Sequence, residues 1–251
     1  MKEKVENPWG KVKESDLFFE KDKKIIERFN EKLENHPHYI YSDLLPEPYM
    51  GNPKANVILL FANPGYGKNE RADYKIPGFQ NAIINNLTHF NKEYPYYYLN
   101  PDFVHQSSDG KPKYTDGGKW VLDRTRELRK ELNINEKELS EKIFTIQLHP
   151  YHSEKFKPVK EKFVGYQYTM SLFFDAVERA LKEEALIVCA RSYRYWNTEY
   201  QNRYGENADL IKDLGTNFIK MQNPRSVYFT SKNLGEENFT KLKNKLNAKL
   251  K

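Results

Sequence analysis

The chain has 251 residues, enough for one well-buried α/β domain, and its aromatic share of 14% argues against a disordered protein. Its 41 lysines and arginines against 35 acidic residues give a net charge of +6, which mildly favours a polyanionic partner. A single cysteine, Cys189, excludes an intramolecular disulfide and any metal or iron–sulfur site held by several cysteines. The first residues lack the apolar core of a signal peptide, and no apolar stretch is long enough to span a membrane. We therefore expect a cytoplasmic protein without a membrane partner.

Residues 1–47 are predicted to form an N-terminal helical extension followed by a connector. The residues up to about Glu14 are charged and show no periodicity, so we expect them to be loosely held. Ser15 is suited to cap a helix whose apolar residues recur on one face as far as Leu33. Four prolines within residues 36–54 indicate an extended segment rather than a helix or strand.

From residue 56 onward, short apolar runs of strand length alternate with helical patterns. Continuous apolar runs are typical of strands that are covered on both faces, and strands separated by helices form parallel sheets. We expect four such strands, at residues 56–62, 143–148, 185–190 and 217–221. The sequence therefore predicts a three-layer α/β/α fold around a central four-stranded parallel sheet, and we assign residues 48–251 to this domain.

Ligands of such sheets bind beyond the carboxyl ends of the strands. The four segments that leave these ends are polar or basic, at residues 63–66, 147–150, 191–194 and 222–226. We expect the functional site in these loops.

Two of the loops resemble motifs of the uracil-DNA glycosylase superfamily. Asn63-Pro64-Gly65 is similar to the first motif of the mismatch-specific uracil/thymine branch, which has an asparagine at this place. Asn223-Pro224-Arg225-Ser226 resembles the second motif of the same branch. An Asn-Pro-Gly sequence alone is also an ordinary turn, so the order of strands and loops together is what favours this family.

The resemblance spans residues 48–251 and implies the uracil-DNA glycosylase-like fold and activity. The expected function is a monofunctional DNA glycosylase that hydrolyses the N-glycosidic bond of uracil, or of another damaged or modified base, after the base flips out of DNA. It implies duplex or single-stranded DNA as the partner, a monomeric state, and neither a metal nor a cofactor. The alternatives are a catalytically silent DNA-binding or defence protein of the same fold, and a hydrolase acting on nucleotides.

The same resemblance implies catalytic roles for Asn63 and Asn223. Asn63 would position the attacking water. Because an amide is not a base at neutral pH, it would orient the water without deprotonating it. The alternative is that Asn63 only tolerates a tight turn before Pro64.

Three residues would contact the extruded base. Phe79 stands where the superfamily places its stacking aromatic, and Gln147 falls near its base-reading asparagine. Tyr66 would form a wall of the pocket. The alternatives are a core aromatic for Phe79, a one-residue slip in the alignment at Gln147 and an exposed loop tyrosine for Tyr66.

Four residues are expected to contact the rest of the DNA. Arg225 would fill the gap left by the base or bind phosphate, although the family usually has a small residue after this proline. Ser226 and Lys232 would contact phosphates, and Arg191 lies on the same rim. Any one such basic residue is more often a solvated surface charge.

Two histidines, His149 and His152, lie close together in the loop after the second strand. Without a third ligand, and with Pro150 against helical spacing, they favour a structural or rim role over a metal site.

The glycosylase hypothesis requires that the turns near residues 63 and 223 meet around a cavity sized for one nucleobase.

Overall fold

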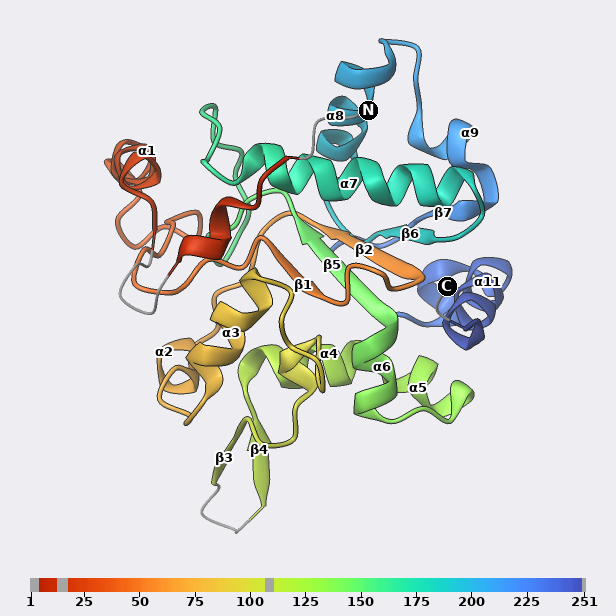
Figure 1. Ribbon diagram of the computed structural model, residues 1–251, viewed down its shortest axis with the longest axis horizontal. Coiled ribbons are helices and arrows are strands. Elements are labelled where there is room, and N and C mark those ends of the chain that lie inside the picture. The colour runs from red at the N-terminus through yellow and green to blue at the C-terminus, as the bar shows by residue number, and fades with distance from the viewer. Residues whose placement is uncertain (1–4, 13–17, 107–110, 250–251) are drawn as a thin grey trace.

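A computed structural model describes residues 5–12, 18–106 and 111–249, and Figure 1 shows a central sheet with helices on both faces. In the described part of the chain, the strands of this sheet are β1 (Tyr49–Gly51), β2 (Val57–Phe61), β5 (Ile143–Gln147), β6 (Leu186–Cys189) and β7 (Phe218–Lys220). The arrangement is three-layered α/β/α, as the alternation of apolar strands with helices predicted.

The sheet is mixed, with the strand order β1-β5-β2-β6-β7. β2 pairs in parallel with β5 and β6, and β6 pairs in parallel with β7, whereas β1 pairs antiparallel with β5. The expectation of a four-stranded, wholly parallel sheet is corrected by this edge strand. β1 lies in the proline-rich stretch that we expected to be a connector. Three residues are too few to show an alternating pattern, and a sheet edge tolerates nearby prolines such as Pro48 and Pro53.

Helices cover the sheet on both sides. α7 (Tyr166–Leu181) contacts β5 and β6, and Figure 1 shows α3 (Phe79–Leu87), α4 (Asp116–Arg124) and α6 (Glu136–Lys142) on the opposite side. No helix of the described ranges is long and apolar enough to cross a membrane. The other elements are α1 (Glu20–Asn30), α2 (Glu70–Asp73), α5 (Arg126–Leu132), α8 (Tyr193–Tyr204), α9 (Leu210–Leu214), α10 (Ser231–Leu234), α11 (Glu236–Asn247), the 3₁₀ turns η1 (Pro8–Lys11), η2 (Tyr97–Leu99) and η3 (Gly215–Asn217), and the hairpin β3 (Val104–Gln106) with β4 (Pro112–Tyr114).

The central position of β2 explains its sequence. It is hydrogen-bonded to β5 on one side and to β6 on the other, and α11 packs against it. All five of its residues are buried, so an uninterrupted apolar run is favourable there. Its last residue, Phe61, brings the chain to the carboxyl edge of the sheet, where the loop beginning at Asn63 follows.

The N-terminal segment is anchored more firmly than its charged sequence predicted. Trp9 in η1 is only 1% exposed and packs against the start of α7, where a Cβ on Gly165 would lie 2.2 Å from the indole Cζ2. The Asn7 side chain donates a 2.7 Å hydrogen bond to the carbonyl oxygen of Leu87. The expectation that residues before Glu14 are loosely held is therefore corrected for residues 5–12, whereas Ser15, the expected helix cap, lies outside the described residues.

Candidate functional site

A cavity of about 490 Å³ lies at the carboxyl ends of β2 and β5. Its volume is in the usual range for sites that bind small organic molecules, about 300–1,000 Å³. Phe61 and Gln147 line it from the last positions of the two strands, and the face of α4 with Trp120 and Arg124 closes another side. The parallel pairing of β2 with β5 therefore brings together residues that lie far apart in the chain.

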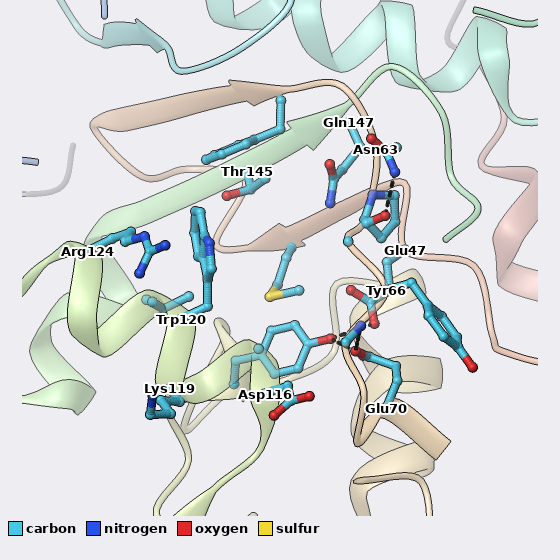
Figure 2. A pocket seen from close by; sticks show the side chains of 18 of the residues that line it. Glu47, Asn63, Tyr66, Glu70, Asp116, Lys119, Trp120, Arg124, Thr145 and Gln147 are labelled. Carbon is cyan, nitrogen blue, oxygen red and sulfur yellow. Dashed lines mark hydrogen bonds between the residues drawn. The ribbon is translucent and has the colours of Figure 1, made fainter. Parts of the chain in front are cut away.

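The walls of the cavity differ in character from one end to the other. Figure 2 shows Arg124 on one side of Trp120 and the carboxyl groups of Glu47 and Glu70 on the other. Between them the cavity is aromatic, because the ring of Trp120 packs edge-to-face on Phe61 at 5.7 Å. A ligand in this space would meet cations at one end, flat apolar surfaces in the middle and carboxyl groups at the other end.

Glu47 and Glu70 form a buried carboxyl pair around one phenol. They are 2% and 4% exposed, and the Tyr98 hydroxyl lies 3.0 Å from Glu47 Oε1 and 3.4 Å from Glu70 Oε1. A hydroxyl has one hydrogen, so it cannot fully satisfy both carboxylates at once. Burial raises the pKa of Glu70 to about 7 and also raises the pKa of Glu47. The pair therefore holds a proton at near-neutral pH.

His152 supports this pair from the protein side. Its Nδ1 lies 2.8 Å from the carbonyl oxygen of Gly65, and its Nε2 lies 3.2 Å from that of Leu45 and 3.7 Å from Glu47 Oε1. Both ring nitrogens lie within hydrogen-bond distance of backbone carbonyl oxygens. This buried histidine therefore joins the loop at Gly65 to the segment that carries Glu47, which is a structural role of the kind we expected.

The other histidine of the pair, His149, lies away from the cavity. It packs against the rings of Phe156 and Phe163, and burial lowers its pKa to about 4. Within the described ranges, no group of three or more His, Cys, Asp or Glu side chains is arranged to hold a metal ion.

Asn63 lines the cavity, as expected for a catalytic residue. Its amide nitrogen donates to the carbonyl oxygen of Pro64 (2.6 Å) and to the Oγ and carbonyl oxygen of Ser153 (2.9 and 3.0 Å). These acceptors fix the orientation of the amide group. Its Oδ1 accepts no hydrogen bond from the described residues, so this oxygen is the amide atom that has no protein partner there.

Gln147 also lines the cavity and is 8% exposed. Its Oε1 is buried and has no hydrogen-bond partner among the described residues. A buried polar oxygen without a partner is costly, and a ligand that donates a hydrogen bond would remove that cost. The structure thus places an unpartnered amide oxygen at the cavity, and the base-reading role of Gln147 stays a prediction.

The two aromatic residues expected to contact the base, Tyr66 and Phe79, occupy different parts of the structure. Tyr66 lines the cavity, but its ring stacks on Tyr41 at 3.5 Å, and Figure 2 shows it directed away from Trp120. Phe79 is fully buried behind the cavity, where its ring centroid lies 5.8 Å from that of Tyr98. The structure therefore places Phe79 in the core behind the wall, and the other aromatic residues that line the cavity are Phe61, Tyr96, Tyr98 and Trp120.

The second motif lies at the same edge of the sheet but outside the cavity. Asn223 and Arg225 are exposed, and the Oδ1 of Asn223 accepts from the backbone N–H of Arg225 at 3.1 Å, which closes a local turn. Ser226 and Lys232 do not line the cavity either. The structure thus brings Asn63, Tyr66, Gln147 and Arg191 together and leaves Asn223, Arg225, Ser226 and Lys232 beside them.

Arg191 connects the two loops. It lines the cavity, and its Nε donates to the carbonyl oxygen of Pro224 at 3.2 Å. The turns near residues 63 and 223 are therefore on one rim, although only the first contributes side chains to the cavity.

The cavity residues that were not predicted from the sequence include Glu47, Glu70, Trp120 and Arg124. Glu47 gave a usable signal, because it is the one acidic residue in the otherwise apolar stretch 44–50. The other three occupy ordinary amphipathic or polar positions. Nothing in their local sequence indicates that α2 and α4 face the end of β2.

Comparison of the chain with protein-family models, with curated proteins and with solved structures finds no match in any of the three. Function is therefore argued from the cavity and its loops.

Proposed function

We propose that this cavity receives a single nucleobase extruded from DNA and that the protein hydrolyses the N-glycosidic bond of that base. The observation that carries the proposal is that Asn63 and Gln147, from the ends of two neighbouring strands, line one cavity with aromatic walls. Their order along the chain agrees with the motif resemblance. The later Asn223 loop lies on the same rim but does not line the cavity, so the expected meeting of the two turns around the cavity is supported only for the turn at Asn63. Uracil and other damaged or modified bases are the substrate class.

The aromatic walls suit a flat ligand. The edge-to-face pair of Phe61 and Trp120 offers apolar ring surfaces, and Tyr98 adds a third. Bases outside the duplex are held by stacking and by hydrogen bonds to their edges. Gln147 can read such an edge because an amide both donates and accepts.

The chemistry needs a placed water molecule and stabilised charge. As the bond between the sugar and the base breaks, positive charge develops on the sugar and negative charge on the base. Asn63 Oδ1 would accept a hydrogen from the water that adds to the sugar carbon. The buried pair of Glu47 and Glu70 would place a negative charge near the cationic sugar and give its shared proton to the departing base. The proton that the water loses as it adds to the sugar would return to this pair.

DNA is the proposed partner, approached from the carboxyl edge of the sheet by the protein acting as a monomer. The exposed loop with Arg225 lies beside the cavity on this edge, and Arg191 connects it to the mouth. A base that enters the cavity would therefore leave its flanking phosphates near cationic side chains, which is the usual basis of DNA affinity.

The test is excision from oligonucleotides that carry uracil, hydroxymethyluracil, hypoxanthine or phage-type modified bases, with abasic sites revealed by alkaline strand cleavage. We expect Asn63→Ala to lower the rate of abasic-site formation by about 100-fold or more, because the water loses its orienting acceptor. Its DNA affinity should stay within about twofold of that of the wild type.

Asn223→Ala is the matched comparison, because Asn223 is also an amide after a strand but lies outside the cavity. We expect it to change DNA affinity more than the rate of the chemical step. Equal activity of Asn63→Ala and the wild-type protein, or no abasic sites from any substrate with the wild-type protein, would reject the proposal.

A second candidate, hydrolysis of free nucleotides, is favoured by one observation: Arg124 and Arg191 line the same cavity as the carboxyl pair. A nucleotide has an anionic group at one end and a hydrogen-bonding base at the other. Release of free base from deoxynucleoside monophosphates, with no release from oligonucleotides, would support this candidate over the first.

A further inference from the structure

We propose that Arg124 and Arg191 form a phosphate site at the mouth of the cavity, which holds a phosphate of the nucleotide whose base lies inside. The presence of a base inside the cavity rests on the proposed function, whereas the phosphate site itself does not. The sequence did not assign Arg124 to any site.

The two guanidinium groups have no carboxylate partner among the described residues, although both line the cavity. Arg124 is the last residue of α4, Arg191 follows β6, and both line the cavity. Neither forms an ion pair with any residue in the described part of the chain. Asp123, the carboxylate next to Arg124 in sequence, contacts Arg126 at 2.7 Å and Lys119 at 3.6 Å instead.

The two cations also repel each other. Burial lowers the pKa of Arg191, and the positive charge of Arg124 lowers it further, which places the groups within electrostatic reach. Two like charges that lie close together repel each other, and an anion between them relieves this repulsion. An anionic ligand would therefore gain from both.

Aromatic rings fix the orientation of Arg124. Its guanidinium carbon lies 4.4 Å from the ring centre of Tyr228 and 5.3 Å from that of Trp120. Its Nε is buried and has no acceptor among the described residues. Stacking uses the faces of a guanidinium and leaves its N–H edge available, and that edge matches two oxygens of a phosphate.

Arg191 is held in a complementary way. Its Nε donates to Pro224 O, which ties the base of the guanidinium to the rim. Its terminal nitrogens make no hydrogen bond to the described residues, so they are free to bind an anion. The two arginines therefore present N–H donors from two different elements.

The rest of the cavity indicates which anion fits. At the opposite end are the carboxyl pair and Gln147, with the ring of Trp120 between (Figure 2). A simple anion would use only the arginine end. A nucleotide would use both ends, because its phosphate carries the charge and its base offers a flat ring with hydrogen-bonding edges.

The decisive experiment uses duplex DNA with one tetrahydrofuran abasic site, so that the identity of the base does not matter. The phosphate on either side of the site is replaced in turn by a neutral methylphosphonate. We expect one of the two replacements to weaken binding to the wild-type protein by about tenfold. Arg124→Gln and Arg191→Gln should weaken binding to the unmodified duplex by a similar factor. When the methylphosphonate replaces the same phosphate, the affinity of these variants should fall little further.

Two further variants distinguish the loss of this phosphate contact from a general loss of positive charge. Arg71→Gln removes the same charge from an exposed arginine that pairs with Asp43 outside the cavity, so it should keep the full response to the methylphosphonate. Arg124→Lys keeps the charge but loses the planar fork, and we expect an intermediate affinity. Thermal unfolding of each variant checks that it is folded. If the methylphosphonate weakens binding of Arg124→Gln and Arg191→Gln as much as it weakens binding of the wild-type protein, the proposal is overturned.

Free ligands provide the second arm, which does not require DNA binding or catalysis. Trp120 fluorescence is titrated with inorganic phosphate, deoxyuridine and deoxyuridine monophosphate, with Trp120→Phe as the blank. Trp9 and Trp196 are 1% and 0% exposed and should respond little. Tighter binding of the monophosphate than of the nucleoside, lost in Arg124→Gln, would support the site even if no base is excised. Failure of the wild-type protein to bind DNA, phosphate and the monophosphate would overturn it.

Discussion

The carboxyl group of Glu70 makes the stability of the fold depend on pH. Its Oε2 accepts from the backbone N–H of Gly67 at 3.1 Å, but burial outweighs this and raises its pKa from 4.5 to about 7. The folded protein therefore binds more protons than the unfolded chain between these two values. A group of this kind contributes stability that is fully present below about pH 4.5 and is lost as the pH rises through about 7.

We therefore expect Glu70→Gln to remove part of this pH dependence. Between about pH 5 and 8 the wild-type protein should lose up to about 3 kcal/mol of unfolding free energy relative to the variant. Urea unfolding at several pH values measures this difference. His89 and His149, whose pKa values burial lowers to about 4, destabilise the fold as the pH falls, but both proteins contain them and their effect cancels.

Glu199→Gln is the control for this comparison. Burial of Glu199 opposes ionisation, but hydrogen bonds from Tyr166 and Lys162 outweigh it and lower its pKa. Its carboxyl group is therefore ionised in both states over the measured range, and the profile should keep its wild-type shape. Parallel profiles for Glu70→Gln and the wild-type protein would show that Glu70 does not hold a proton at neutral pH.

Site residues were predictable from sequence where a strand end positions them. Asn63, Gln147 and Arg191 all follow or end a recognisable apolar strand, so the rule for parallel sheets placed them on one rim. Glu70 and Arg124 were not predictable because they belong to helices whose rotation and packing depend on the rest of the chain. Phe79 shows the opposite error, since its motif position suggested a surface for stacking and the fold buries it.

The 3₁₀ turn η1 packs into the core, although its charged surroundings in the sequence predicted a loosely held segment. The segment is short and surrounded by charges, yet Trp9 and Val12 belong to the main hydrophobic core together with Ile25 and Ile26 of α1. The contact is tight because Gly165, at the start of α7, leaves room for the indole ring. One aromatic side chain therefore fastens the N-terminal segment to the sheet layers.

We expect Trp9→Ala to lower the free energy of unfolding by about 3 kcal/mol or more, because it removes a large buried ring and leaves a cavity. Phe90→Ala is the matched control: Phe90 is 62% exposed, so the change should stay within about 0.5 kcal/mol. Chemical denaturation of the three proteins at one pH measures both values. A neutral Trp9→Ala would restore the view that this segment is loosely held.

Strands made of continuous apolar runs were predicted better than the extents of helices. β2, β5, β6 and β7 all lie within the ranges expected from continuous apolar runs. Trp120, Val121, Leu128 and Leu132 are apolar residues whose pattern predicts one helix. The chain instead forms α4 and α5 with a break at Thr125, whose hydroxyl donates to the carbonyl oxygen of Val121. The apolar periodicity continues across Thr125, so the sequence pattern did not reveal the break between the two helices.

For the molecule as a whole, the direction of the parallel strands separates two edges with different roles. The loops with Asn63, Arg191 and Arg225 all leave carboxyl ends, and the cavity opens among them. Glu47 comes from the segment that we assigned to the N-terminal extension, so that segment and the main domain build one site. The amino-terminal edge, where Lys54 precedes β2, is far from these loops because the strands separate them.

This separation predicts how DNA binding depends on salt. If DNA lies on the carboxyl edge, Arg225→Gln should reduce the slope of log affinity against log salt concentration by about 1, the value for one lost phosphate contact. Lys54→Gln removes the same charge from an exposed side chain at the opposite edge, so its slope should equal that of the wild type. Fluorescence anisotropy of a labelled duplex between about 50 and 200 mM salt measures all three slopes. If Arg225→Gln and Lys54→Gln lower affinity alike, the attraction comes from the net charge of +6 rather than from the carboxyl edge.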